Sequence, residues 1–86
     1  MSDDTPRDKF ETVLLQLIAE RGPDKSFTPE EAARSVDPED WRSRLREIRT
    51  AAISLMKSGE AAILRKGKPV EDPDQFKGVY RISGPR

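Results

Sequence analysis

The sequence of 86 residues contains no cysteine and no histidine. Without cysteine, disulfides and thiolate chemistry are excluded. Without histidine, the commonest general base and the commonest metal ligand are missing. No apolar run is long enough to span a membrane, and the first four residues are polar and acidic, unlike a secretory signal. We therefore expect a soluble cytoplasmic protein that contacts no membrane and holds no metal and no cofactor.

Motifs for catalysis are absent as well. No serine has a histidine to activate it, and the segment Arg65–Pro69 lacks the spacing and the following helix of a phosphate-binding loop. Acidic pairs such as Glu30–Glu31 are better explained as the first turn of a helix than as a cation site. We therefore predict that the chain is not an enzyme.

Charge is distributed unevenly along the chain, although sixteen basic residues balance sixteen acidic ones. Residues 1–40 hold five basic and eleven acidic residues, a net charge of −6. Residues 41–68 hold eight basic and two acidic residues, a net charge of +6, and residues 69–86 carry three of each. Such asymmetry indicates a polyanionic partner.

Three helix starts share one pattern, in which a capping side chain precedes a proline and an acidic residue follows. They are Thr5–Asp8, Thr28–Glu31 and Asp37–Asp40. A Thr or Asp side chain caps free amides of the first turn, and proline at the first helical position sacrifices no hydrogen bond. From the first start, apolar residues recur at helical spacing from Phe10 to Ile18, and Gly22–Pro23 ends that helix.

The second and third helices follow the other two starts. The second is expected at 29–36, and its small apolar residues would allow close approach to a neighbouring helix. The third, the longest, is expected at 38–58, with Gly59 as its C-cap. Apolar residues from Trp41 to Met56 lie on one face of this third helix.

After the third helix the pattern changes to that of short strands. Two strands are expected at 61–65 and 78–82. The loop between them, 67–77, is rich in glycine, proline and charge, as hairpin loops are. A further very short strand at 25–27 would place Phe27 in the core.

The predicted elements occur in the order helix, short strand, helix, helix, strand, loop, strand, which indicates an α+β fold. Two helices joined by a tight connection make a helix-turn-helix, and a β-hairpin follows. This is the winged-helix arrangement, with 38–58 as the recognition helix and 67–77 as the wing. We expect one such domain over residues 6–83, with flexible ends at 1–5 and 84–86.

Several short motifs occur together along the chain: Asp40–Arg42, Gly59, Arg65–Val70, Asp72–Pro73 and Lys77–Ile82. A tryptophan-bearing helix followed by the Gly-Lys-Pro-Val and Lys-Gly-x-Tyr-Arg-Ile pieces resembles a small bacterial family of domains of unknown function. The resemblance covers roughly residues 10–83 and implies a winged-helix fold. It implies no activity, because the family itself is uncharacterised.

The arginines of the third helix fall into two groups. Arg44 is expected to pair with Asp40 and Glu47, which lie at helical spacing from it. On the other flank, three arginines project within about 60° of one another: Arg42, Arg46 and Arg49. Arg46 and Arg49 have no acidic residue at helical spacing, and a local rule broken without local compensation points to function.

Cations at the base of the predicted wing form a second group: Arg65, Lys66 and Lys68. In a helix-turn-helix, side chains near the start of the second helix reach base edges and phosphates, and the wing base would hold phosphates of the same duplex. The acidic wing tip, Glu71–Asp74, is expected to stay away from that duplex. We therefore predict a duplex-DNA-binding module that uses the six residues of the two groups.

Other interpretations stay open at this point. The stems of the flank arginines could cover core edges while their heads stay in water, or acids of the first helix could pair with Arg46 and Arg49. The same surface could instead bind an acidic protein partner, which would make the chain a protein-interaction domain without DNA binding. Trp41 could stack on a base, but its alignment with Leu45 and Ile48 favours core packing. The sequence does not fix the oligomeric state.

Overall fold

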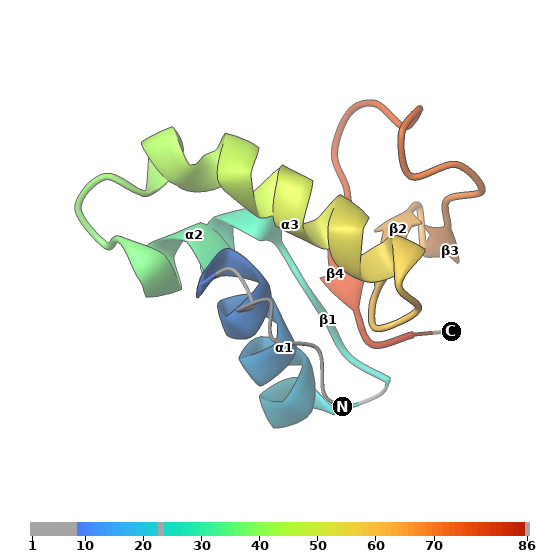
Figure 1. The fold of residues 1–86 in the computed structure, drawn as a ribbon, viewed down its shortest axis with the longest axis horizontal. Helices are drawn as coiled ribbons and strands as arrows, with labels where there is room; N and C mark the ends of the chain where they lie inside the picture. Colours follow the sequence, from blue (N-terminus) through green and yellow to red (C-terminus); the bar gives the residue numbers. More distant parts are fainter. Residues whose placement is uncertain (1–8, 23, 86) are drawn as a thin grey trace, which may run out of the picture.

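The computed structural model describes residues 9–22 and 24–85, in which helices pack beside a small sheet (Figure 1). The elements of this part are α1 (Lys9–Arg21), β1 (Ser26–Phe27), α2 (Pro29–Val36), the 3-10 helix η1 (Trp41–Arg44), α3 (Leu45–Lys57), β2 (Ala62–Arg65), β3 (Lys68–Pro69) and β4 (Arg81–Ser83). The α+β architecture is confirmed. The predicted helix start at 5–8 and the predicted flexible end at 1–5 lie outside the described residues, as does Arg86, the last residue of the predicted flexible end at 84–86.

The start of α2 has the capping geometry that its sequence predicts. Thr28 Oγ1 accepts a hydrogen bond from the amide of Glu31 at 3.2 Å, and the Glu31 carboxylate accepts one from the amide of Thr28 at 3.0 Å. This reciprocal capping box satisfies two amides that a helix start otherwise leaves free. Arg21 of α1 also donates to Glu31, at 2.8 Å. The backbone bond from Thr28, and then the bond from Arg21, lowers the pKa of Glu31.

The third helix begins later than its predicted range of 38–58. Between Asp37 and Leu45 the chain forms a bend and then η1, and regular α-helix begins only at Leu45. Asp37 Oδ1 accepts from the amide of Asp40 at 3.0 Å, and Asp40 accepts from the Ser43 hydroxyl at 2.8 Å. Such local bonds from Asp and Ser side chains offer the backbone an alternative to the helix, which the apolar spacing does not reveal.

The C-terminal end of α3 confirms the predicted cap. The amide of Glu60 donates to the carbonyl of Leu55 at 2.9 Å, and the amide of Gly59 donates to Met56 at 3.1 Å. These bonds are of the kind that close a helix ending in glycine. They turn the chain directly into β2.

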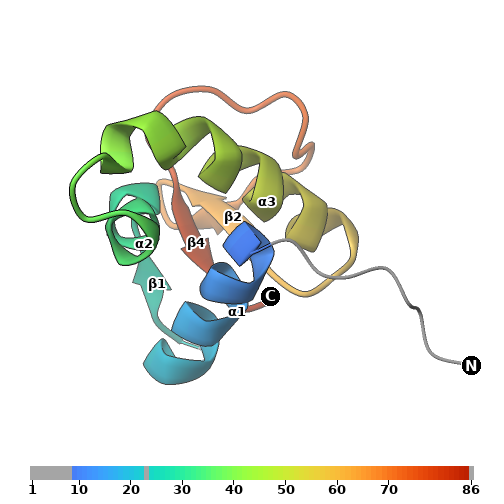
Figure 2. The ribbon, with the colours of Figure 1, turned by 60° about the vertical axis from the view of Figure 1, so that its left-hand side comes forward.

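The strands of the described part form one antiparallel sheet in the order β1-β4-β2-β3. Phe27 of β1, Ile82 of β4 and Ile63 of β2 are register neighbours, and all three are fully buried. The strands β2 and β4 lie behind α1 and α3 in Figure 2, so these helices cover one face of the sheet. The very short strand predicted at 25–27 is thereby confirmed, with Phe27 in the core.

The predicted hairpin loop 67–77 is not a single loop. Its first residues form β3, which a two-residue turn at Lys66–Gly67 joins to β2. The φ angles of this turn are +54° and +83°, the left-handed values that a tight hairpin turn requires. Residues 70–80 then form a long loop that returns to the other side of β2. The strand predicted at 78–82 therefore begins only at Arg81.

The core joins the helices to the sheet. Leu14 of α1 and Ile48 and Leu55 of α3 are fully buried with the row of sheet residues. Ala32 and Ala33 of α2 are fully buried too, because their small side chains let this helix approach its neighbours closely. Within the described ranges, no helix is both long enough and apolar enough to cross a membrane.

Candidate nucleic-acid interface

The six predicted contact residues differ in what their side chains do. Three are exposed, with no hydrogen bond or ion pair from the side chain to any described residue: Arg46, Lys66 and Lys68. Arg42 is also exposed, and its guanidinium lies 4.5 Å from the ring centroid of Trp41. The other two donate to main-chain carbonyls of the loop 70–80: Arg49 and Arg65. The structure therefore divides the predicted site into free cations and cations that hold a loop.

Arg49 fastens this loop to α3. Its Nη2 donates to the carbonyl of Phe76 at 2.8 Å, and its guanidinium carbon lies 4.0 Å from the centroid of the Phe76 ring and 6.0 Å from that of Tyr80. The two rings meet edge to face at 5.1 Å. Burial raises the pKa of Tyr80 to about 12, although the positive charge of Arg49 acts in the opposite direction. Arg49 has no acidic partner at helical spacing, as the sequence shows, but a carbonyl 27 residues away accepts a hydrogen bond from it.

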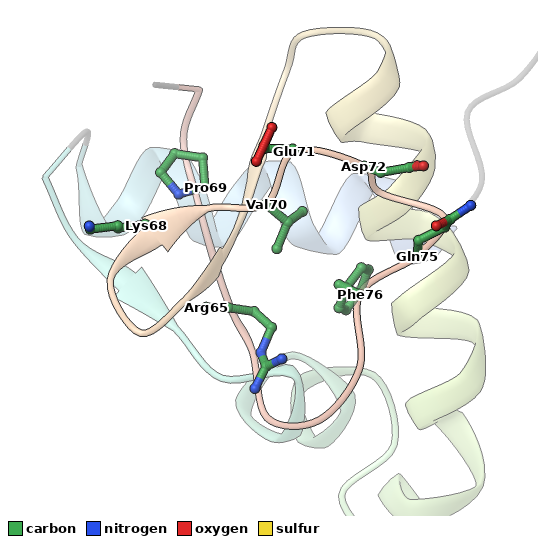
Figure 3. Close-up of a pocket in the computed structure, with 8 residues that line it drawn as sticks. All are labelled: Arg65, Lys68, Pro69, Val70, Glu71, Asp72, Gln75 and Phe76. Atoms are coloured by element: carbon green, nitrogen blue, oxygen red, sulfur yellow. The ribbon is translucent and has the colours of Figure 1, made fainter.

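Arg65 fastens the other end of the loop to β2. Its Nε donates to the carbonyl of Val79 at 3.1 Å, and in Figure 3 its side chain projects toward this end of the loop. Gly78 lies under the guanidinium, where an added Cβ would stand 3.1 Å from Arg65 Nη2. The φ angle of Gly78 is also positive, at +85°. Glycine at this position thus meets both a steric and a backbone requirement.

The acidic centre of the loop is tied to the end of α3. Lys57 Nζ lies 2.9 Å from Asp74 Oδ2, and the amide of Asp74 donates to Asp72 Oδ1 at 2.9 Å. The turn predicted at Asp72–Asp74 is confirmed. Both figures of the whole fold show the loop arching beside α3 (Figures 1 and 2). The segment therefore packs on the helix instead of projecting as a free wing tip.

Arg44 has two acidic partners, as expected, but one of them differs from the prediction. It lies 3.4 Å from Glu47 and 3.4 Å from Asp37. The predicted partner Asp40 precedes η1 and bonds Ser43 instead. Hydrogen bonding to Glu47 raises the pKa of Arg44. The backbone bond from Asp40 is the main cause that lowers the pKa of Asp37, and Arg44 adds to it.

The solvent-facing side of η1 and α3 is polar and carries mostly positive charge. Its exposed residues are Arg42, Ser43, Arg46, Glu47, Thr50, Ser54 and Lys57. Glu47, the one acid among them, is paired with Arg44. Among the described residues, no acid of α1 pairs with Arg46 or Arg49. The alternative in which the first helix neutralises these arginines thus has no support in the described part of the chain.

The family comparison gives a name to the resemblance seen in the motifs. A family model described as "Protein of unknown function (DUF3253)" matches residues 7–85. The chain belongs to this family. No curated protein matches it. The expected membership in a family of unknown function is confirmed.

In this member of DUF3253 the free cations among the six predicted residues lie in two places. We call Arg42 and Arg46 the helix patch, and Lys66 and Lys68 the hairpin patch. Figure 3 shows Lys68 on the side of the hairpin that faces away from α3, across an open pocket of about 440 Å³ from Gln75. The loop held by Arg49 and Arg65 separates the two patches. The sequence predicted that these cations lie near one another. Spacing along the chain could not show that the loop 70–80 folds back onto α3.

One further cation was missed by sequence reasoning. Arg34, in the last turn of α2, has its guanidinium 4.5 Å from the centroid of the Trp41 ring. Arg34 belongs to the acidic segment 1–40, so segment charges conceal it. Helical spacing gives no signal for it, because Glu30, Glu31 and Asp37 stand three or four residues from Arg34 and would be expected to pair with it.

Within the described ranges, no group of three or more acidic side chains is arranged to hold a metal ion. The site offers exposed guanidinium and ammonium groups, with hydroxyls beside them. These groups donate hydrogen bonds and attract anions.

Proposed function

We propose that the chain is a winged-helix module that binds duplex DNA through η1 and the exposed side of α3. The order α1, β1, α2, α3, β2, β4 supports the fold assignment, because it places a helix-turn-helix directly before paired strands. In this proposal the segment 66–80 is the wing, and its part 70–80 folds back onto α3. The module acts by binding and is not an enzyme.

The observation that carries the proposal is the contrast between Arg46 and Arg44. Arg44 has two acidic partners, whereas Arg46 is exposed and pairs with no described residue. Arg46 lies in the first turn of α3, the part of a recognition helix that reaches base edges and phosphates. Exposed hydroxyls at Thr50 and Ser54 continue the same polar surface. Arg42 and Arg46 are therefore assigned to enter or border the major groove.

The remaining four cations take two different roles in this proposal. Lys66 and Lys68 hold phosphates along an adjoining stretch of backbone. Arg49 and Arg65 are not assigned DNA contacts in this proposal, since each donates a hydrogen bond to a loop carbonyl and so holds the loop. They are positioning residues that fix the loop between the two patches.

Charge reversal at the helix patch tests the proposal. Binding of a labelled random-sequence duplex is measured by fluorescence anisotropy for the wild type, for Arg46→Glu and for Lys25→Glu. Lys25 is exposed and precedes β1, at the edge of the sheet opposite β3, so its variant makes the same charge change far from the hairpin. We expect Arg46→Glu to abolish binding and Lys25→Glu to retain it.

The hairpin patch is tested in the same assay. The double variant Lys66→Glu, Lys68→Glu should weaken binding and lower the salt dependence, because each lost phosphate contact removes roughly 0.9 from the slope. Equal losses in Arg46→Glu and Lys25→Glu would contradict the proposal, since net charge alone would then explain the binding. The absence of any binding at low salt would refute it.

A second candidate function, binding of an acidic protein partner, is favoured by one apolar feature. Val79 is 85% exposed and borders a groove of about 300 Å³ between the starts of α2 and α3, with Leu45 and Pro29 in its walls. Acidic residues of a partner would pair with the helix patch while an apolar side chain enters this groove. Co-purification of a partner with the wild type, but with neither Val79→Asp nor Arg46→Glu, together with no duplex binding, would support it.

A further inference from the structure

Two arginines from different elements lie against the same indole ring. The guanidinium carbons of Arg34, from α2, and Arg42, from η1, are each 4.5 Å from the centroid of Trp41. The two cations are consequently no farther apart than twice that distance. Trp41 itself is half-buried and packs against the core, so the ring is a fixed support.

Neither guanidinium is neutralised by a described residue. Glu31, three residues before Arg34, is bonded to Arg21. Asp37, three residues after it, lies 3.4 Å from Arg44. The described acids at helical spacing are thus either engaged elsewhere or, like Glu30, form no ion pair with Arg34. The chain brings two positive charges to one ring at an exposed site, and no described carboxylate forms an ion pair with either.

An indole support leaves the hydrogen-bonding edges of a guanidinium available. A guanidinium that lies over an aromatic ring with its flat face keeps its N–H groups for a fork that fits the oxygens of a phosphate. Because the ring holds both cations in place, less side-chain freedom is lost on binding than for free arginines. A bound anion would also relieve the repulsion between the two cations.

We propose that Arg34 and Arg42, supported by Trp41, form a clamp for a backbone phosphate of the duplex that the helix patch reads. This inference rests on the proposed function and adds to it a contact residue from α2 that the basic segment of the sequence does not contain. The geometry suits a helix-turn-helix, whose first helix crosses the DNA backbone while the second enters the groove.

The sole tryptophan of the chain makes the clamp directly observable. Its emission is followed while unlabelled duplex is added, and the affinity is measured by anisotropy at several salt concentrations. The variant Arg34→Gln removes one cation, and Lys25→Gln removes the same charge at an exposed position before β1. We expect Trp41 emission to change as duplex is added, and the Kd from this change should equal the Kd from anisotropy. The slope of log affinity against log salt should fall by about 0.9 in Arg34→Gln and stay unchanged in Lys25→Gln.

The possible results separate this inference from the function on which it rests. If the wild type binds duplex and Arg46→Glu does not, but Arg34→Gln keeps the full slope and Trp41 emission is insensitive to DNA, the clamp is refuted and the DNA-binding function stands. An equal emission change with inorganic phosphate, at the same phosphate concentration, overturns the assignment to duplex. If the wild type does not bind duplex, both proposals fail.

Discussion

Replacing Arg49 by Met tests whether this arginine holds the loop 70–80 in place. Met keeps an apolar stem but removes both the hydrogen bond to Phe76 and the positive charge over two rings. A hydrogen bond from a charged group contributes about 1.5–3 kcal/mol, and a cation over an aromatic ring contributes about 0.5–1 kcal/mol where it is partly solvated. Because Arg49 is only half-buried and the Met stem still packs, we expect a loss at the lower end of this sum, about 2 kcal/mol, in the free energy of unfolding.

The assay is thermal and urea unfolding followed by circular dichroism. For a domain of this size, 1 kcal/mol corresponds to roughly 4–8 °C in Tm, so Arg49→Met should lower Tm by roughly 8–16 °C. The matched control is Arg46→Met, three residues earlier on α3, where the side chain is exposed and bonds no described residue. Its free energy of unfolding should stay within about 0.5 kcal/mol of the wild type. Equal effects of the two substitutions, or no effect of either, would refute the assignment of Arg49 as a positioning residue.

Two further predictions concern stability. Thr28→Ala should cost about 1 kcal/mol, because it removes the capping bond to the amide of Glu31; Thr28→Ser, which keeps the hydroxyl, should recover most of that loss in urea unfolding. Tyr80 has a folded-state pKa of about 12 against an ordinary value of 10.0, so the folded state retains the phenol proton more strongly than the unfolded state. The stability from this group is present below pH 10 and is lost as pH rises toward 12. Ultraviolet titration of this sole tyrosine should show the raised midpoint, and Tyr80→Phe should lack that share of the alkaline loss; a midpoint near 10 would contradict the burial argument.

Local signals predicted most of the fold. The capping residues Thr28 and Glu31 determined where α2 begins, because the bonds that fix a helix start involve residues only three positions apart. Glycine at position 59 likewise marked the end of α3. Phe27 could be assigned to the core because it is a large apolar residue with polar residues before it and a helix start after it.

The parts that the sequence did not reveal depend on contacts between distant residues. Helical spacing showed that Arg49 lacks an acidic neighbour, but a carbonyl of the loop, 27 residues later, is its partner. The prediction of helix over the first residues of 38–58 was wrong for a different reason. Asp37 and Asp40 bond nearby backbone and side-chain groups, and such bonds favour turns over helix. Arg34 went unnoticed because its stacking on Trp41 joins two elements that segment charges treat separately.

The six cations that the sequence predicts to contact DNA do not share one role, and this changes the DNA-binding hypothesis. The helix patch and the hairpin patch remain available to an anion, whereas Arg49 and Arg65 are bonded within the fold. If the charge of Arg49 were reversed, weaker duplex binding would have two explanations: the loop 70–80 is released, or a contact with DNA is lost. Substitutions at Arg46 avoid this problem.

The central claim is tested most directly by the salt dependence of duplex binding, measured side by side for the wild type and Arg46→Gln. If the four cations of the two patches each neutralise a phosphate, log affinity should fall linearly with log salt, with a slope of roughly −3.6 for these four contacts and roughly −4.5 if Arg34 contributes a fifth. Arg46→Gln should reduce the magnitude of that slope by about 0.9 while the protein stays folded. A wild type that does not bind at low salt, or a slope that Arg46→Gln leaves unchanged, would contradict the account.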